Sequence, residues 1–220
     1  GIRDHGCDWS SDVSLPISAQ TIDVHLKQVG YSDASGAKHV LSYDKLVLAS
    51  GSRLAASNTQ GVAEYAFDVD QIETAVRLED HLKSLANVPE SKARNTVVVA
   101  GGGFTGIETA TEMPARLRAI LGEGADIEVI IVDRGEKIGT SMGVEISESI
   151  AEASAELGVK WSLKSSVVAV DESGVTLSDG RHIDAKTVVW TTGVRASSLT
   201  EQVPGERDAL GRLHVDGQQI

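Results

Sequence analysis

Hydrophobic residues in the second half of the chain form short runs that predict strands alternating with helices. Val97–Ala100 is a continuous apolar run, and Ile127–Val132 is interrupted only by Glu128; both are mostly β-branched, which is typical of buried parallel strands. Apolar residues recur at helical spacing over 69–85, and helices are also predicted from Ile107 onward and over 144–157. Strands that alternate with helices in this order predict an α/β fold class with a parallel sheet.

The predicted helices carry signals for their ends and for a break. Asp68 or Asp70 is positioned to cap the start of the first helix. Pro114 lies inside the second helix, where it removes a backbone hydrogen bond and is expected to kink or split the helix. Gly158 is expected to end the third helix as its C-terminal cap.

Shorter patterns predict further strands on both sides of these helices. After the third helix, short β-branched runs predict strands at 159–163, 167–170 and 174–177, and Asp179-Gly180 predicts a hairpin turn, so a β-meander is expected here. A last buried strand is predicted at 187–190. In the first third of the chain, strands are expected at 21–26 and 39–41. Leu46–Ala49 is a continuous apolar run and predicts a buried parallel strand, followed by a loop over 54–67.

A Gly-x-Gly-x-x-Gly motif follows the strand at Val97–Ala100 directly and opens the next helix. In such motifs Gly101 would permit a tight turn, Gly103 would let the backbone approach a phosphate, and Gly106 would let the helix pack closely on the strand. The free amides at the helix start then favour an anion. Asp133 ends the next strand, where the ribose hydroxyls of a dinucleotide would lie. The alternative is a tight strand–helix turn that binds nothing.

The end of the first apolar strand is repeated later in the chain. Leu46–Arg53 and Val188–Arg195 align at a fixed offset of 142 (193 − 51), and each follows a small antiparallel hairpin. The two segments therefore indicate two copies of the back half of a dinucleotide-binding domain. Only the second copy is preceded by a glycine motif, which favours a chain that begins inside the first copy over a first copy that has degenerated.

Composition narrows the range of partners. The formal net charge of −12 and the sequence pI near 4.9 argue against nucleic acid or an anionic membrane surface, since both require clustered Lys and Arg. The single cysteine, Cys7, excludes a disulfide framework, and the six scattered histidines lack ligand spacing, so no metal site is expected. No apolar run approaches the ~20 residues of a membrane span, and a reducing, cytoplasmic setting is expected.

Four motifs together resemble a known family of enzymes. They are Tyr43–Ser52, Gly101–Glu108, Trp190–Val194 and Gly211–Asp216, and the resemblance covers about residues 20–220. The chain resembles the two-dinucleotide-binding flavoprotein reductases, which are FAD-dependent pyridine nucleotide oxidoreductases, and most closely the type II NADH dehydrogenases. The resemblance implies that an outer domain binds FAD and that an inserted domain binds NADH. Hydride would pass from NADH to the flavin, and a quinone or another small acceptor would reoxidise the flavin.

The resemblance also implies how the chain is divided. Residues 1–94 would be part of an FAD-binding domain with a linker helix, 95–200 a Rossmann-like NAD(P)H-binding domain with a β-meander, and 201–220 a segment that returns toward the FAD domain. No glycine motif precedes residue 46, and the family's later Gly-Asp segment and membrane-binding part are not found in the sequence. The chain is therefore expected to be a fragment, whose parent touches a membrane through parts outside it. A homodimer is left open.

Site residues carried over from the resemblance lie mostly in the second domain. Glu108 matches the family's acid near the contact of nicotinamide and flavin, and the alternative is an acid placed in the first helical turn by the helix dipole. Asp133 would favour NADH over NADPH, whereas Arg134 would accommodate a 2′-phosphate. The pyrophosphate would lie on the glycine loop, at Gly101, Gly102, Gly103, Phe104, Thr105 and Gly106.

Two further turns are implied to contact the rings of the cofactors. Thr192, Gly193 and Val194 would line the nicotinamide side, and Ser50 and Gly51 the FAD side. The alternative for both turns is a strand end at which glycine serves only the backbone shape. No side-chain nucleophile is needed, because the cofactors carry the chemistry.

Two other function classes stay open at this point. The chain could be a non-catalytic nucleotide-binding module, which would bind NADH without reducing any acceptor. It could also be a flavin-free Rossmann enzyme, either a short-chain dehydrogenase or a methyltransferase. A short-chain dehydrogenase requires Tyr-x-x-x-Lys, and none of Tyr31, Tyr43 or Tyr65 has a lysine four residues later. A methyltransferase would not have the repeated strand end at Leu46–Arg53.

Overall fold

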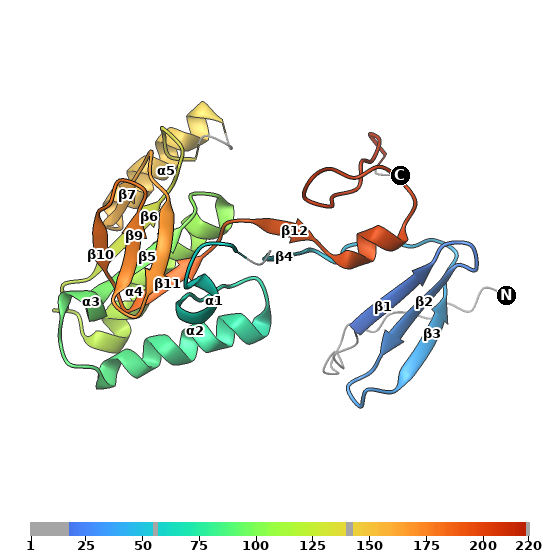
Figure 1. Ribbon diagram of the computed structural model, residues 1–220, viewed down its shortest axis with the longest axis horizontal. Coiled ribbons are helices and arrows are strands. Elements are labelled where there is room, and N and C mark those ends of the chain that lie inside the picture. Colours follow the sequence, from blue (N-terminus) through green and yellow to red (C-terminus); the bar gives the residue numbers. More distant parts are fainter. Residues whose placement is uncertain (1–17, 55–56, 140–142, 219–220) are drawn as a thin grey trace. The chain divides into compact units, whose positions relative to one another are not determined.

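The computed structural model describes residues 18–54, 57–139 and 143–218 (Figure 1). Contacts divide the chain into two compact units. One unit holds the described residues up to Ser52 together with those from Arg195 onward, and the other is Arg53–Val194. The division expected from the sequence, with boundaries at 94 and 200, is a different one, because it separates the parts by the nucleotide that each would bind. That division stays a prediction.

The larger unit is built on a four-stranded parallel sheet in the order β11-β5-β6-β7. The strands are β5 (Thr96–Ala100), β6 (Glu128–Val132), β7 (Val159–Ser162) and β11 (Thr187–Trp190). In register, Val99 pairs with Ile131 on one side and with Val189 on the other. Every residue of β5 is buried, as expected for a central parallel strand covered on both faces.

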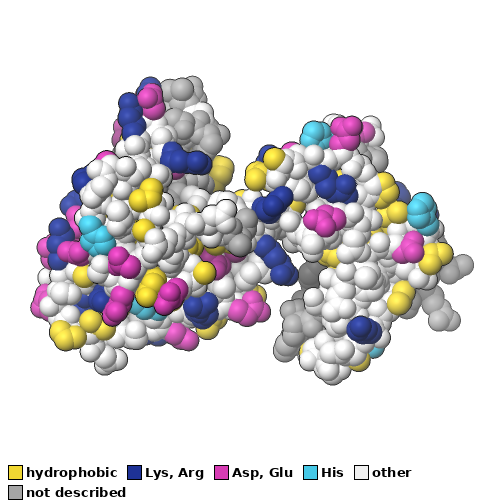
Figure 2. All heavy atoms as spheres, in the orientation of Figure 1, with side chains coloured by type: hydrophobic (Ala, Val, Ile, Leu, Met, Phe, Trp, Pro, Cys, Tyr) yellow, Lys and Arg dark blue, Asp and Glu magenta, His cyan; other side chains and the backbone are white. Residues whose placement is uncertain are grey.

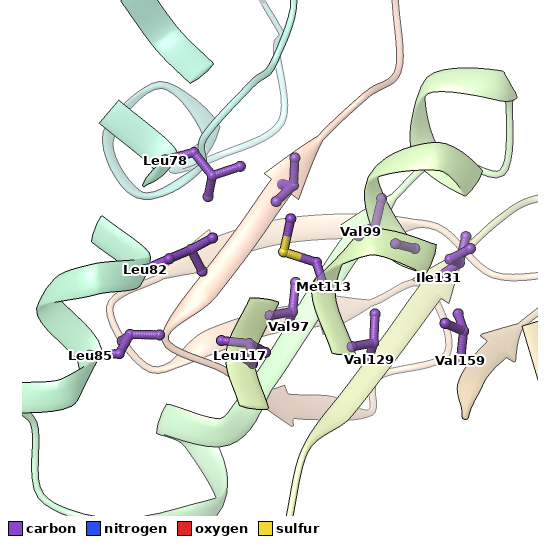
Figure 3. Close-up of a cluster of buried hydrophobic side chains, with 12 residues drawn as sticks. Leu78, Leu82, Leu85, Val97, Val99, Met113, Leu117, Val129, Ile131 and Val159 are labelled. Carbon is purple, nitrogen blue, oxygen red and sulfur yellow. The ribbon is translucent and has the colours of Figure 1, made fainter. Parts of the chain in front are cut away.

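Helices cover one face of this sheet. α4 (Phe104–Leu121), α2 (Ile72–Ser84) and the 3-10 turn η1 (Leu85–Asn87) contribute to one buried cluster with alternate residues of β5 and β6 (Figure 3). Figure 3 shows Leu82 and Leu117 facing Val97, with Met113 beside them. Because strand side chains alternate, this cluster takes Val97 and Val99 and leaves Val98 for the other face.

A β-meander packs against the other face of the parallel sheet. β8 (Val167–Asp171), β9 (Gly174–Leu177) and β10 (His182–Asp184) form an antiparallel sheet in the order β10-β9-β8. Their inward residues join Val98 and Val188 in a second buried cluster. The predicted α/β fold, with its parallel sheet and meander, is therefore confirmed.

Short helices and one longer helix complete this unit. α5 precedes β7 and ends before Leu157, and Gly158 has the left-handed φ of 76° that the predicted C-terminal cap requires. The remaining helices are two single turns that the sequence pattern did not predict. The bounds are α1 (Val62–Tyr65), α3 (Lys92–Asn95) and α5 (Val144–Glu156).

The smaller unit contains a three-stranded antiparallel sheet of β1 (Ser18–Asp23), β2 (Gln28–Ser32) and β3 (Lys38–Ser42), in that order. A 3-10 helix, η3 (Ser198–Gln202), lies beside β1, where the amide of Ile22 donates to Oε1 of Gln202 at 2.7 Å. β4 (Ser52–Leu54) and β12 (Val194–Ala196) are the two segments through which the chain passes from one unit to the other, and they pair with each other.

The predicted buried strand at Leu46–Ala49 is wrong. These residues form no strand, and the Val47 side chain is 86% exposed. A parallel strand needs hydrogen-bonding neighbours on the sheet and cover on both faces. Within the described part of the smaller unit, β1, β2 and β3 pair only with one another, so the run has no ladder to join.

Three further details differ from the sequence prediction, two in the predicted helices and one in a predicted loop. Of the kink or split predicted at Pro114, the split is wrong, since α4 continues through this residue. The turns before and after Pro114 bury residues against the same sheet, and this packing outweighs one lost hydrogen bond. Gln71, and neither of the predicted residues Asp68 and Asp70, caps α2, and it forms a capping box with Thr74. Asp68 instead accepts from the Thr74 hydroxyl at 2.6 Å. The predicted loop over 54–67 contains α1.

Figure 2 shows Lys and Arg side chains scattered among Asp and Glu on the visible face of the molecule. Among the helices that the structure describes, none combines the length and apolar character of a membrane span. Within the same residues, no group of three His, Cys, Asp or Glu side chains converges as metal ligands would.

Helix α2 allows a matched test of the helical core. Leu82 is 1% exposed in the cluster beneath α2, whereas Ile72 on the same helix is 81% exposed. Leu82→Ala should lower the free energy of unfolding by about 2–5 kcal/mol, because it leaves a cavity. Ile72→Ala should stay within about 0.5 kcal/mol. Urea unfolding measures both, and equal effects of the two substitutions would contradict the packing described here.

His81 gives the larger unit a predicted pH dependence. It stacks on Phe67 at 4.4 Å and its Nε2 lies 2.9 Å from Oγ1 of Thr187. Burial lowers the pKa of His81 below its ordinary value of 6.5, although a hydrogen bond with the Lys186 backbone acts in the opposite direction. As pH falls below about 6.5, the unfolded chain takes up a proton on His81 before the folded chain does, so the free energy of unfolding decreases. The decrease continues until pH reaches the lowered pKa of His81 in the folded chain, and above about pH 6.5 this loss is absent.

His81→Gln should remove this part of the pH dependence, whereas the exposed His25→Gln should keep it. Unfolding free energies measured at several pH values between about 7 and 5 test the point. The wild type should lose stability more steeply than His81→Gln, and parallel curves would show that His81 does not titrate as described.

Candidate functional site

A cavity of about 390 Å³ lies at the carboxyl ends of β5, β6 and β11 in the larger unit. β5 connects to β6 through α4, whereas β11 returns on the other side of β5, so the strand order reverses at this point. Ligands of open parallel sheets bind at such a reversal. The lining residues are Thr59, Ala100, Gly101, Val132, Asp133, Arg134, Ser165, Ser166, Val167, Trp190, Thr192 and Gly193.

The glycine loop brings α4 against the end of β5. Gly101 has a φ of 117°, and a Cβ on it would lie 2.6 Å from Cγ2 of Thr192. A Cβ on Gly106 would clash with the carbonyl oxygen of Gly101. Both positions therefore require glycine, one for the turn and one for the close packing of helix on strand.

The start of α4 is open. The helix begins at Phe104 after Gly103, and no side chain caps it. A Cβ on Gly103 would meet nothing within 4 Å, and the Phe104 side chain is 67% exposed. The first amides of a helix have no partner inside the helix, and they attract an anion when no side chain satisfies them.

Asp133 is tied to the glycine loop by its side chain. Its Oδ2 accepts from the amide of Gly102 at 2.8 Å and its Oδ1 from the amide of Gly135 at 2.7 Å. Arg134 follows it with an exposed side chain, and both residues line the cavity. The site therefore presents one carboxylate and one guanidinium beside the glycine turn.

The end of β11 forms the opposite wall. The Thr191 hydroxyl donates to the carbonyl of Ala100 at 2.9 Å, and Trp190 Nε1 donates to the carbonyl of Thr192 at 3.1 Å. These bonds hold Thr192 and Gly193 at the cavity. Val194 begins β12 and is not among the lining residues.

The remaining predicted residues lie elsewhere. Glu108 is exposed in the second turn of α4, and because the first turn holds no acidic residue, the explanation of Glu108 as a first-turn acid is wrong. Ser50 and Gly51 belong to the smaller unit, where both are exposed and the Gly51 carbonyl accepts from the amide of Ser197. The structure thus groups the glycine loop, Asp133, Arg134 and the 192–193 turn.

Sequence reasoning missed part of the cavity wall. Ser165 and Ser166 follow the end of β7, so the same rule that placed Asp133 at the sheet edge would have placed them there. Ser165 is 3% exposed, and its hydroxyl has no hydrogen-bond partner among the described residues. Thr59 comes from the segment before α1, for which the sequence offered no signal.

An NADH dehydrogenase-like protein and a type II NADH:quinone oxidoreductase are among the curated relatives of the chain. The chain is 49% identical over 177 residues to an NADH dehydrogenase-like protein of Mycobacterium tuberculosis, which covers 80% of this chain and 44% of the relative. It is 30% identical over 175 residues to the type II NADH:quinone oxidoreductase of Staphylococcus haemolyticus, with 74% and 44% covered. The chain therefore spans less than half the length of these relatives.

Solved structures show the same fold. NDH2 from Plasmodium falciparum in complex with NADH matches with a TM-score of 0.68 at 20% identity, over 84% of this chain and 42% of that one. A water-forming NADH oxidase from Lactobacillus brevis bound to NADH matches with a TM-score of 0.62 at 20% identity, over 88% and 40%.

The same substitution at two glycines of the loop should destabilise the chain at Gly106 and leave its stability nearly unchanged at Gly103. Gly106→Ala places a methyl group against backbone that cannot move aside, so it should lower the free energy of unfolding by about 1–3 kcal/mol. Gly103→Ala meets open space at a φ of −79° and should change stability by less than about 0.5 kcal/mol. Thermal unfolding compares them, and a stable Gly106→Ala protein would contradict the helix–strand contact.

Fold, site and relatives agree with a match that covers nearly the whole sequence. The family model for pyridine nucleotide-disulphide oxidoreductases matches residues 10–219. The four motifs that carry the resemblance all lie within this range. The chain belongs to the pyridine nucleotide-disulphide oxidoreductase family.

Proposed function

We propose that the larger unit binds NADH and that the chain is part of an FAD-dependent NADH oxidoreductase. The observation that carries the proposal is the uncapped start of α4 behind the glycine loop, beside a cavity at the point where the strand order reverses. The names of the two relatives, an NADH dehydrogenase-like protein and a type II NADH:quinone oxidoreductase, support NADH as the nucleotide. Membership of the family argues against a flavin-free short-chain dehydrogenase or methyltransferase.

The residues at the cavity fit a dinucleotide. Gly103 leaves space over the helix start, so a pyrophosphate can approach the amides of Phe104, Thr105 and Gly106. Asp133 and Arg134 line the part of the cavity next to the glycine turn, where an adenosine ribose would lie. Thr192 and Gly193 line the wall formed by β11, on the proposed nicotinamide side.

Hydride transfer needs a flavin beside the nicotinamide. When bound, FAD would accept the hydride of NADH and release electrons singly or in pairs to an acceptor. The exposed Glu108 on α4 is the residue that we assign to the nicotinamide–flavin contact, and the Ser50-Gly51 turn is assigned to the FAD side. The protein's task is to orient the two rings and exclude water.

A quinone is the acceptor that we propose for the whole protein. The support is the name of the relative from Staphylococcus haemolyticus, a type II NADH:quinone oxidoreductase. The parent protein would then contact a membrane peripherally, since quinones are dissolved in membranes. Whether it forms a homodimer is a separate question that its oligomeric state in solution would answer.

Substitutions of Gly103 can test NADH binding without disturbing the fold, because a side chain at this position would meet open space. Gly103→Val fills only the space over the helix start, so it should weaken NADH binding at least about tenfold, or about 1.4 kcal/mol. Gly103→Ala is the matched control and should bind more tightly than the valine variant. Calorimetric titration measures both affinities, and thermal unfolding checks that both variants fold. Wild-type affinity in Gly103→Val would refute the proposed position of the pyrophosphate.

The flavin step is tested on the same protein after incubation with FAD. A protein that becomes yellow and bleaches when NADH is added anaerobically supports the oxidoreductase. A chain that binds NADH but neither retains FAD nor reduces an added quinone or dye would support the alternative, a non-catalytic NAD(H)-binding module.

A further inference from the structure

Trp161 lies beneath the glycine loop, on the edge strand β7. It pairs in register with Ile131 of β6, and Asp133 is two residues after Ile131. Paired residues of parallel strands point to the same face, as do residues two apart along a strand. Hydrogen bonding continues past the end of β6, because the Asp133 amide donates to the Ser162 carbonyl at 3.0 Å. Trp161 and Asp133 therefore lie on the same face of the sheet as α4.

Gly102 touches both of these side chains. A Cβ on Gly102 would lie 2.8 Å from Cζ3 of Trp161 and 3.0 Å from Cγ of Asp133. Since Gly102 is the variable position of the Gly-x-Gly-x-x-Gly motif, the motif itself does not require glycine there. The indole ring and the carboxylate together explain why this position holds glycine.

The Asp133 carboxylate is fixed from two directions. Its oxygens accept from the amides of Gly102 and Gly135, and the Trp161 ring packs beside Gly102. The Trp161 ring is held by packing alone, because its Nε1 is buried without a hydrogen-bond partner among the described residues. An unsatisfied indole N–H lowers stability, so this tryptophan does not serve the fold through its polar atom.

We propose that Trp161 is a positioning residue that holds the Gly102 turn and the Asp133 carboxylate in place, and thereby sets the preference for NADH over NADPH. The inference rests on the proposed function. A carboxylate repels the 2′-phosphate of NADPH only while it is held near that phosphate. If it moves away, Arg134 is left on the same cavity wall and attracts the phosphate.

The test compares the affinities of the full chain for NADH and for NADPH. Trp161→Leu removes the ring and should reduce the ratio of the affinity for NADH to the affinity for NADPH at least about tenfold. Trp161→Phe keeps an aromatic ring and should preserve the ratio to within about twofold. Asp133→Asn keeps an oxygen for the Gly102 amide but removes the charge, so it marks the ratio expected when the repulsion is lost. Phe67→Leu, at a different cavity of the same unit, is the control for general loosening and should leave the ratio unchanged.

Gly102→Ala provides a second route to the same result. It keeps both the ring and the carboxylate but forces them away from the loop, so it should also lower the ratio. If Trp161→Leu does not fold, Gly102→Ala alone tests whether Trp161 positions the Asp133 carboxylate.

Each outcome has a separate meaning. A ratio that stays at the wild-type value in Trp161→Leu and Gly102→Ala, even if both nucleotides bind more weakly, would overturn the positioning role. A wild-type chain that prefers NADPH, or shows no preference, would overturn it as well. If the wild type binds neither nucleotide, the proposed function itself fails, and the binding measurement shows this before any ratio is taken.

Discussion

The close contact between α4 and the turn after β5 is the constraint on which the rest of the larger unit depends. Gly106 lies so near the Gly101 carbonyl that no side chain fits between them. This contact brings the first turn of α4 to the carboxyl edge of the sheet, where no side chain caps its first amides. A larger residue at either glycine would move the helix away from β5, and the cavity at this edge would lose its shape.

The same contact also organises the core. With α4 on one face, alternate residues of β5 point into the helical cluster, and Val98 is left for the β-meander on the other face. Two hydrophobic clusters thus fix the position of a single central strand. The amide donors and Asp133 lie beyond the end of that strand and of its neighbour, so a rigid scaffold presents them.

Sequence reasoning succeeded where local pattern and physical need coincide. The β5–glycine loop–α4 segment and the β-meander were predicted because β-branched runs, glycines and turn residues follow the geometry of these elements directly. The strand predicted at Leu46–Ala49 is wrong because a strand also needs neighbouring strands to pair with, and a run of apolar residues does not show whether these are present. The cap of α2 is Gln71 and neither Asp68 nor Asp70, because the helix begins one residue after Gln71 and Asp68 accepts from the side chain of Thr74 instead.

The candidate site shows the same limit. The glycine loop and Asp133 could be placed from spacing, since they end adjacent parallel strands. Ser165 and Thr59 reach the cavity from separate segments, and only the assembled sheet brings them to it. The packing of Trp161 on Gly102 depends on the register of β7 with β6, which no local pattern encodes.

The central claim is that amides at the start of α4 hold the pyrophosphate of NADH. Its most direct test is the amide nuclear magnetic resonance spectrum of the isotope-labelled chain during addition of NADH. The account predicts saturable shifts that are largest for the amides of Gly103, Phe104, Thr105 and Gly106, with smaller changes at Thr192 and Gly193. Shifts confined to other parts of the chain, or no shifts at about millimolar NADH, which corresponds to binding weaker than about 4 kcal/mol, would contradict it.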